Sequence, residues 1–355
     1  MKTKIKCSLF VLTVSLIVLG PDARAQNSST VTFSEEGAVR IPDVGRARVG
    51  YAACGPNGIS YITSMIDPNT SADTRLTSVA VDATVVDYHV STVQGLIRAF
   101  VRSVAPDAAG VSVLVDALPN GGDATSSILQ GKTQFLVRYN LSGQQQSLYG
   151  LSADFSYQRI ASQSAKLLRA LRIEKNSGKL AVVSLDLEGN VLGTVDMKGE
   201  ILTAAEVESY IGKLGIEGIE SSPPAGKMET AASPIQMQGL DGVVFLVKPG
   251  TDNRVYRIDE QGGVNSIHLL TQAGVDPRSV FLDSDLGLTM LTFGPGERDA
   301  SLLSFNRLTG KESGQLKISG MAPTSSVCRY AGKFYGTRVE KTGATLMVGT
   351  QNGLH

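Results

Sequence analysis

Three histidines, His89, His268 and His355, are the first residues to consider for chemistry, because histidine is a frequent general base and metal ligand. His355 is the last residue of the sequence, and the other two lie in strand-like runs, DYHVST and NSIHLL. No G-x-S-x-G motif supplies a nucleophilic serine for either of them. No two histidines or cysteines have the spacing of a zinc-binding pair. We therefore predict no catalytic residues, and we interpret His89 and His268 as ordinary strand residues.

Acidic residues are the most plentiful candidates for chemistry. Asp283 and Asp285 form a D-x-D on an expected turn, and carboxylate oxygens are the ligands that calcium prefers. The same pair is typical of a solvated hairpin turn, which we favour. We expect no cofactor, leave calcium open as a weak alternative, and assign no metal ligands.

Two basic motifs have structural interpretations as well. SSILQGKT (126–133) ends like a phosphate-binding loop, but Ser126 replaces the required first glycine, so we predict a solvated loop. Lys166, Arg169, Arg172 and Lys175 recur every third residue. On a helix they would form a basic stripe, whereas on a strand they would be ordinary surface charges, and we favour a solvated surface.

The composition excludes some classes of partner. The 355 residues include 33 Lys and Arg against 33 Asp and Glu, so the formal net charge is zero. A neutral chain has no overall field to attract a polyanion, and we predict no nucleic-acid partner.

Residues 1–25 have the pattern of an export signal. Lys2, Lys4 and Lys6 precede an apolar run from Leu9 to Leu19, and Ala23-Arg24-Ala25 offers the small residues of a cleavage site. The run is shorter than the ~20 residues of a membrane span, and no other run is long enough. We therefore expect a secreted or periplasmic protein, with residues 26–355 as one domain and no membrane span.

Short alternating apolar runs joined by glycine-containing turns recur along the rest of the chain, as in consecutive hairpins. Gly242, Gly287 and Gly332 hold the same place in three hairpins spaced 45 residues apart, and Gly58 and Gly110 hold it in two earlier ones. A second hairpin in four of the repeats places a short polar residue at one point of its turn, where the side chain bonds its own backbone. These residues are Asn140, Asp186, Asp259 and Asn306.

Two hairpins per 45-residue repeat make four strands, and the chain in this respect resembles the β-propeller superfamily over roughly residues 50–355. The resemblance implies an all-β propeller. The place of the repeat glycine is expected at positions 58, 110, 154, 198, 242, 287 and 332. These positions predict seven blades, with six as the alternative. We expect a short helical and loop insertion near 200–234 and another insertion at 118–132. The resemblance is architectural and identifies no functional residues.

The two ends of the chain are predicted to close the ring. Residues 29–41 alternate like a strand and can complete the last blade, whose C-terminal part has too few strands. After export, Cys54 and Cys328 are the remaining cysteines, each four residues before its repeat glycine. They are candidates for a disulfide between the first and last blades. However, side chains at equivalent positions of successive blades point in the same sense around the ring, so that if one sulfur faces the neighbouring blade the other faces away. The pairing therefore stays open.

Two functions fit these observations. The first is an exported binding or scaffold propeller that acts as a monomer, with a protein or glycan ligand. The alternative is a metal-assisted hydrolase of lactones, esters or glycans that uses carboxylates in its central channel, which no linear motif needs to reveal.

Overall fold

The computed structural model describes residues 29–352, apart from some internal segments. The segments outside the description are 42–47, 59, 67–72, 81, 91–92, 94, 120–131, 196–235, 241, 249–253, 269–275, 284–286, 294–299, 307–308, 310, 321–322, 324–325 and 341–342. The predicted export signal, the predicted insertion near 200–234 and most of the one predicted at 118–132 therefore lie outside the described residues.

The described residues form 24 strands and one short 3-10 helix, η1 (Pro56–Gly58). The strands group into four-stranded antiparallel units, called blades here, in which consecutive strands are neighbours. Blades 1 to 3 are β2 (Arg48–Cys54), β3 (Ser60–Ile66), β4 (Asp73–Val79) and β5 (Val85–Tyr88); β6 (Leu96–Asp107), β7 (Gly110–Pro119), β8 (Gln134–Asn140) and β9 (Gln145–Gly150); and β10 (Phe155–Ser164), β11 (Leu167–Glu174), β12 (Leu180–Leu185) and β13 (Val191–Val195).

The second half of the chain repeats this arrangement, with one strand borrowed from the N-terminal end. Blades 4 and 5 are β14 (Gln236–Leu240), β15 (Val243–Lys248), β16 (Arg254–Ile258) and β17 (Val264–His268); and β18 (Asp276–Asp283), β19 (Gly287–Phe293), β20 (Ala300–Phe305) and β21 (Glu312–Gly320). Blade 6 is β22 (Ser326–Tyr330), β23 (Lys333–Glu340), β24 (Gly343–Asn352) and β1 (Thr30–Ile41).

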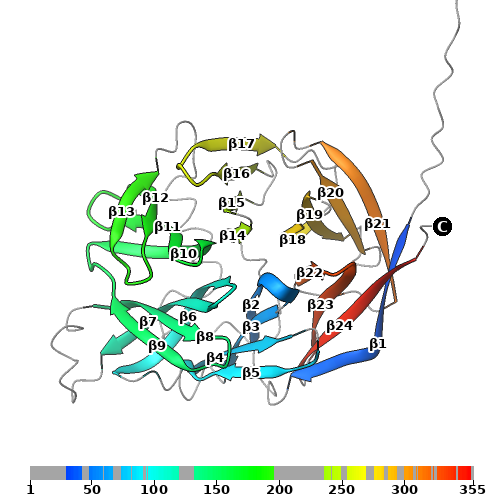
Figure 1. The fold of residues 1–355 in the computed structure, drawn as a ribbon, viewed down its shortest axis with the longest axis horizontal. Coiled ribbons are helices and arrows are strands. Elements are labelled where there is room, and N and C mark those ends of the chain that lie inside the picture. Colours follow the sequence, from blue (N-terminus) through cyan, green and yellow to red (C-terminus); the bar gives the residue numbers. More distant parts are fainter. Residues whose placement is uncertain are drawn as a thin grey trace, which may run out of the picture.

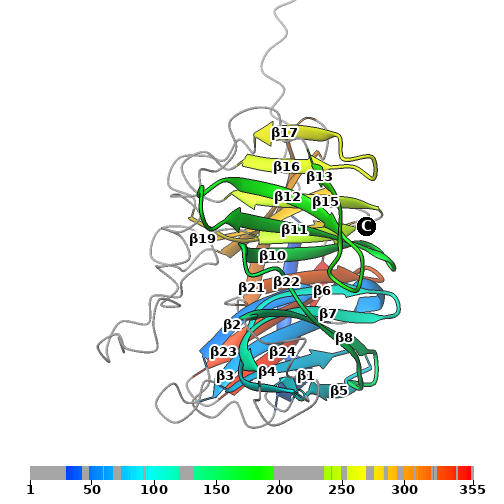
Figure 2. The same ribbon diagram turned by 90° about the vertical axis from the view of Figure 1, so that its left-hand side faces the viewer.

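The blades stand in a ring around a common centre, and the first strand of each blade lies innermost (Figure 1). Seen from the side, the blades form a thick disc (Figure 2). This arrangement is an all-β propeller, as the repeats predicted.

The described residues account for six blades, which was the alternative in the sequence analysis rather than its preferred count of seven. The hairpin turn expected at Asp154 is wrong, because Asp154 lies before β10 in the connection between blades 2 and 3. The corresponding turn of blade 3 is Ala165–Lys166, which has no glycine and so escaped the glycine alignment. The hairpin turn expected at position 198 lies outside the described residues.

The predicted ring closure is confirmed. Strand β1 pairs antiparallel with β24, from Thr30 opposite Asn352 to Ile41 opposite Ala344, with an irregularity between Ser34 and Val39. The first residues of β1 also pair in parallel with β21 of blade 5, a contact that the repeats did not predict. One N-terminal strand therefore completes blade 6 and pairs with the last four residues of the outer strand of blade 5.

Phe33 anchors this closing strand and is 2% exposed. A Cβ atom on Gly349 of β24 would lie 2.8 Å from its ring, and one on Gly336 of β23 would lie 3.0 Å from it. Two glycines on neighbouring strands thus leave the space that the aromatic ring fills.

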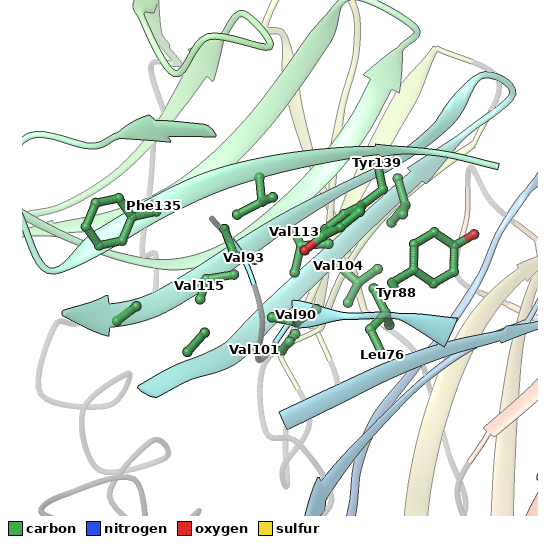
Figure 3. Close-up of a cluster of buried hydrophobic side chains, with 14 of the residues drawn as sticks. Leu76, Tyr88, Val90, Val93, Val101, Val104, Val113, Val115, Phe135 and Tyr139 are labelled. Atoms are coloured by element: carbon green, nitrogen blue, oxygen red, sulfur yellow. The ribbon is translucent and has the colours of Figure 1, made fainter. Parts of the chain in front are cut away.

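Hydrophobic clusters between successive blades hold the ring together. Figure 3 shows the cluster between blades 1 and 2, which includes Leu76 and Tyr88 from blade 1 and Val113, Phe135 and Tyr139 from blade 2. The alternation of apolar residues along each strand produces this packing, because every blade is covered on both faces by its neighbours.

The four predicted polar turn residues behave as expected. The Oδ1 atoms of Asn140, Asp186, Asp259 and Asn306 each accept a hydrogen bond from a backbone N–H two to four residues later, at 2.6 to 3.1 Å. Gly58, Gly242 and Gly332 have φ of 74°, 75° and 76°, which the turn interpretation requires.

Candidate functional site

The residues singled out for chemistry do not come together in the described structure. His89 is exposed just after β5, and His268 ends β17 opposite Arg254, while His355 lies outside the described residues. Asp283 ends β18, and its D-x-D partner Asp285 falls in the segment that is not described. Within the described part of the chain, no group of three His, Cys, Asp or Glu side chains is placed to hold a metal ion.

The basic run around blade 3 forms a strand, β11, and its middle charge is not on the surface. Arg169 is 3% exposed, so the expectation of a solvated surface is wrong at this position. Lys166 and Lys175 are exposed, and Arg172 is half-buried. The guanidinium carbon of Arg172 lies 3.6 Å from the centre of the Phe155 ring, a cation–π contact. The local pattern could not distinguish these environments because the neighbouring blades create them.

Arg169 and Gln163 fasten blade 3 to the two hairpin turns of blade 4. The Nη2 atom of Arg169 donates to the backbone oxygens of Asp259 and Glu260 at 3.2 and 3.0 Å, and Nη1 donates to Ser184 Oγ. Gln163 donates to the backbone oxygen of Gly242 at 2.9 Å. Burial lowers the pKa of Arg169, and nearby Asp259 opposes this shift. This cation therefore has a structural role between blades.

A polar network lies where the innermost strands of blades 2 and 3 meet. Arg102 donates from Nε to Asp116 at 2.7 Å and from Nη1 to Gln158 at 2.9 Å. The Gln134 amide donates to Asp116 and to the Tyr157 backbone oxygen, and its Oε1 accepts from the Tyr157 backbone N–H at 2.6 Å. The amide of Gln134 thus imitates a peptide group and adds a strand-like pairing between blades.

Two ion pairs within blade 2 occupy the carboxylates of Asp107 and Asp116. Asp116 is engaged by Arg102, and the side chain of Asp107, which is 7% exposed as a residue, accepts two hydrogen bonds from Arg138 at 2.7 and 2.8 Å. Both carboxylates are therefore already bound by an arginine of the same blade.

A small cavity lies between the innermost strands β2, β6, β10 and β14, with room for about one water molecule. Its lining is mostly apolar side chains and backbone, from Cys54, Val104, Ala105, Pro106, Ala161, Ser162, Met237, Gln238 and Gly239. A Cβ atom on Gly239 would overlap the backbone oxygen of Ser162, so β14 and β10 approach as closely as backbones allow. This cavity is too small to hold an organic substrate.

Cys54, at the end of β2, and Cys328, in β22, are joined by a disulfide in the structure, with a Cα–Cα distance of 5.6 Å. The bond links the innermost strands of blades 1 and 6 and spans 274 residues of sequence. The sequence left this pairing open, because the rotation between blades, and not the residue spacing, decides whether the two sulfurs face each other.

The blades, their order and the closing strand define the chain as a β-propeller. No protein-family model and no curated protein sequence matches it. Among solved structures, it is similar to a neuraminidase-like protein of A/flat-faced bat/Peru at 12% identity, over 93% of this chain and 95% of that one, with a TM-score of 0.45. Regucalcin of Agrobacterium tumefaciens, a calcium-binding protein, is 10% identical over 91% and 96% of the two chains, with a TM-score of 0.45.

A protein of unknown function from Bacteroides caccae is similar over 74% of this chain and 78% of its own, at 12% identity and a TM-score of 0.40. We transfer no ligand and no residue role from these proteins. The described strands and the short helix η1 include no helix of the length and apolar character that a membrane crossing requires.

Proposed function

We propose that the protein is an exported β-propeller, with residues 26–355 as one domain, that binds a protein or glycan on its outer surface as a monomer and catalyses no reaction. The observation that carries this proposal is the small size of the cavity between four of the innermost strands. The cavity between β2, β6, β10 and β14 has room for about one water molecule, so it does not admit a larger ligand, and we expect such a ligand to bind on the outer surface.

The polar contacts support the same proposal. Arg102, Asp116 and Gln134 bind one another and the adjacent strand β10, and Asp107 is bound by Arg138. Groups that are committed to such contacts stabilise the ring and are not free to activate water or a substrate carbonyl. A rigid ring of this kind suits a scaffold that presents its edges and turns to a partner.

The test separates this function from the alternative of a metal-assisted hydrolase. Purified mature protein is assayed on ester, lactone and glycoside substrates with a chelator, and with calcium at about 1 mM, the range of extracellular calcium modules. Metal content is measured on the same sample. We expect no turnover above that of heat-denatured protein and no stoichiometric metal. Saturable turnover that the chelator abolishes would overturn the proposal and establish the hydrolase.

A further inference from the structure

The outer edges of the blades differ in how they are protected. In blade 5, the last four residues of the outer strand β21, 317–320, pair with β1. Strands β9 and β17 present glutamine, asparagine and serine at their exposed positions, as in Gln145, Gln146, Asn265 and Ser266. These polar side chains offer an added strand less apolar surface to pack against than apolar side chains would.

Strand β13 of blade 3 lacks this protection. Its residues Val191, Leu192, Gly193 and Thr194 are exposed in succession, with Leu192 61% and Val191 45% exposed. The strand contains no charged residue and no proline, and it pairs with β12 alone among the described strands. Figures 1 and 2 show it on the outside of the ring. An apolar strand edge of this kind favours the addition of another strand.

The molecule itself shows what an added strand looks like. On β24, the added strand β1 has the sequence TVTF over residues 30–33, with Val31 and Phe33 buried and the Phe33 ring over Gly349. Strand β13 also carries a glycine, Gly193, and a Cβ atom there would have no neighbour within 4 Å. An aromatic side chain of an added strand can occupy that open space, as Phe33 does at Gly349.

Two carboxylates beside β13 indicate which charge a partner segment carries at the end that lies next to them. The turn that leads into it contains Asp186, which is half-buried, and Glu188, which is exposed, and residues 185–195 contain no lysine or arginine. The hydrogen bonds recorded for the Asp186 carboxylate come from backbone N–H groups and the Asn190 amide, which leave its charge unneutralised. A cation close to Val191 would complement both carboxylates.

We propose that β13 binds an extended segment of a partner protein, which pairs with it as a fifth strand of blade 3. The segment has an uncharged centre of β-branched and aromatic residues, with an aromatic side chain over Gly193, and a lysine or arginine at the end that lies beside the Asp186–Glu188 turn. This inference rests on the proposed binding function and names the class of protein ligand.

The probe is a fluorescent peptide with the sequence of residues 29–34, extended by two lysines at one end or the other. Matched peptides replace its phenylalanine by alanine or its lysines by glutamates. Anisotropy measures binding, and amide hydrogen exchange locates it. We expect saturable binding, slower exchange in residues 191–195, and weaker binding of both matched peptides by about tenfold.

The protein variants are chosen to leave the fold intact. Leu192→Lys places a charge on the edge, and Gly193→Val fills the open space beside the strand. Each should weaken the phenylalanine peptide by about tenfold, whereas Gly193→Val should hardly affect the alanine peptide. Leu141→Lys, at a residue that is 40% exposed in the β8–β9 turn, is the matched control and should bind like the unchanged protein.

Equal binding to the Leu192→Lys and unchanged proteins would overturn this inference. So would slower exchange confined to β21 and β24, which would mean that the peptide displaces β1. These outcomes leave the proposed binding function intact, because another surface would then serve it. Metal-dependent turnover in the separate assay would overturn the proposed function itself.

Discussion

The hydroxyl of Tyr139 is buried between blades 1 and 2 with no hydrogen-bond partner, in a side chain that is 2% exposed. The ring of Tyr139 meets Tyr88 edge to face at 5.6 Å between centroids, so the aromatic part is well packed. Burial raises the pKa of Tyr139 well above its ordinary value near 10, because the phenolate would lose its hydration. At the scale of single residues, this position combines good packing with an unused polar atom.

We therefore expect Tyr139→Phe to stabilise the protein by about 1 kcal/mol or to be neutral, since it removes an unsatisfied hydroxyl. The pH dependence should also change. In the unfolded chain the phenol ionises near pH 10, while the folded state keeps it neutral, so stability falls as the pH rises above 10. The loss is about 1.4 kcal/mol per pH unit for one such group. Urea unfolding between pH 9 and 11 measures this slope, which should be shallower in the variant. An unchanged slope would contradict the assignment.

Ala83 occupies a place that other blades give to glycine. Its φ is 68°, and the turn bonds of Ala80 N to Thr84 O and of Ala83 N to Ala80 O repeat those of Asn140 and Gly143 in blade 2. An alanine in the left-handed region costs the folded state about 1–2 kcal/mol. Glycine removes this strain, but its greater conformational entropy in the unfolded chain offsets up to about 1 kcal/mol of the gain. Ala83→Gly should therefore stabilise the protein slightly, by up to about 1 kcal/mol, in a thermal or urea melt.

The opposite substitution in blade 2 is the control for this pair. Gly143 has a φ of 81°, and a Cβ atom there would lie 2.9 Å from the backbone oxygen of Asp87. Gly143→Ala should destabilise the protein, because strain and a backbone clash add to each other. If both substitutions changed the free energy of unfolding in the same direction, the two turns would not be equivalent.

At the scale of elements, strand β1 holds the ring closed by pairing with β24 and β21. Phe33→Ala removes the ring that fills the space over Gly336 and Gly349, and such a truncation costs about 3–5 kcal/mol. We expect a lower melting temperature and faster amide exchange in β1 and β24. Ser34→Ala, at the adjacent exposed position, should have little effect. Unchanged exchange in β24 would mean that Phe33 does not anchor the strand.

At the scale of the whole molecule, two links join the first and last blades: the closing strand β1 and the Cys54–Cys328 disulfide. A cross-link that encloses 274 residues stabilises by at most about 5 kcal/mol if it acts on the unfolded chain. Reduction, or the double change Cys54→Ser and Cys328→Ser, should lower the melting temperature by up to roughly 7 °C.

Thiol titration of the denatured, unreduced mature protein tests the bond itself. We expect no free thiol, and two would show that the disulfide is absent. The serine variant should still fold, because β1 closes the ring independently of the cysteines.

The sequence determined the features that depend on local physical chemistry. Asn140, Asp186, Asp259 and Asn306 bond their own turns, so their spacing revealed the second hairpin of four blades. Apolar alternation revealed the strands, and the shortage of strands at the C-terminal end identified residues 29–41 as the closing strand. The propeller architecture follows from these signals because each strand and turn is specified within a few residues.

The tertiary structure decided what depends on neighbouring blades. Arg169 is buried because the blade 4 turn lies against it, and nothing in its own run of residues indicates that contact. The turn at Ala165–Lys166 forms without glycine, so the count of blades could not be read from glycines. The parallel pairing of β1 with β21 and the approach of Cys54 to Cys328 depend on how the blades are rotated about the ring, and residue spacing carries no information on that rotation.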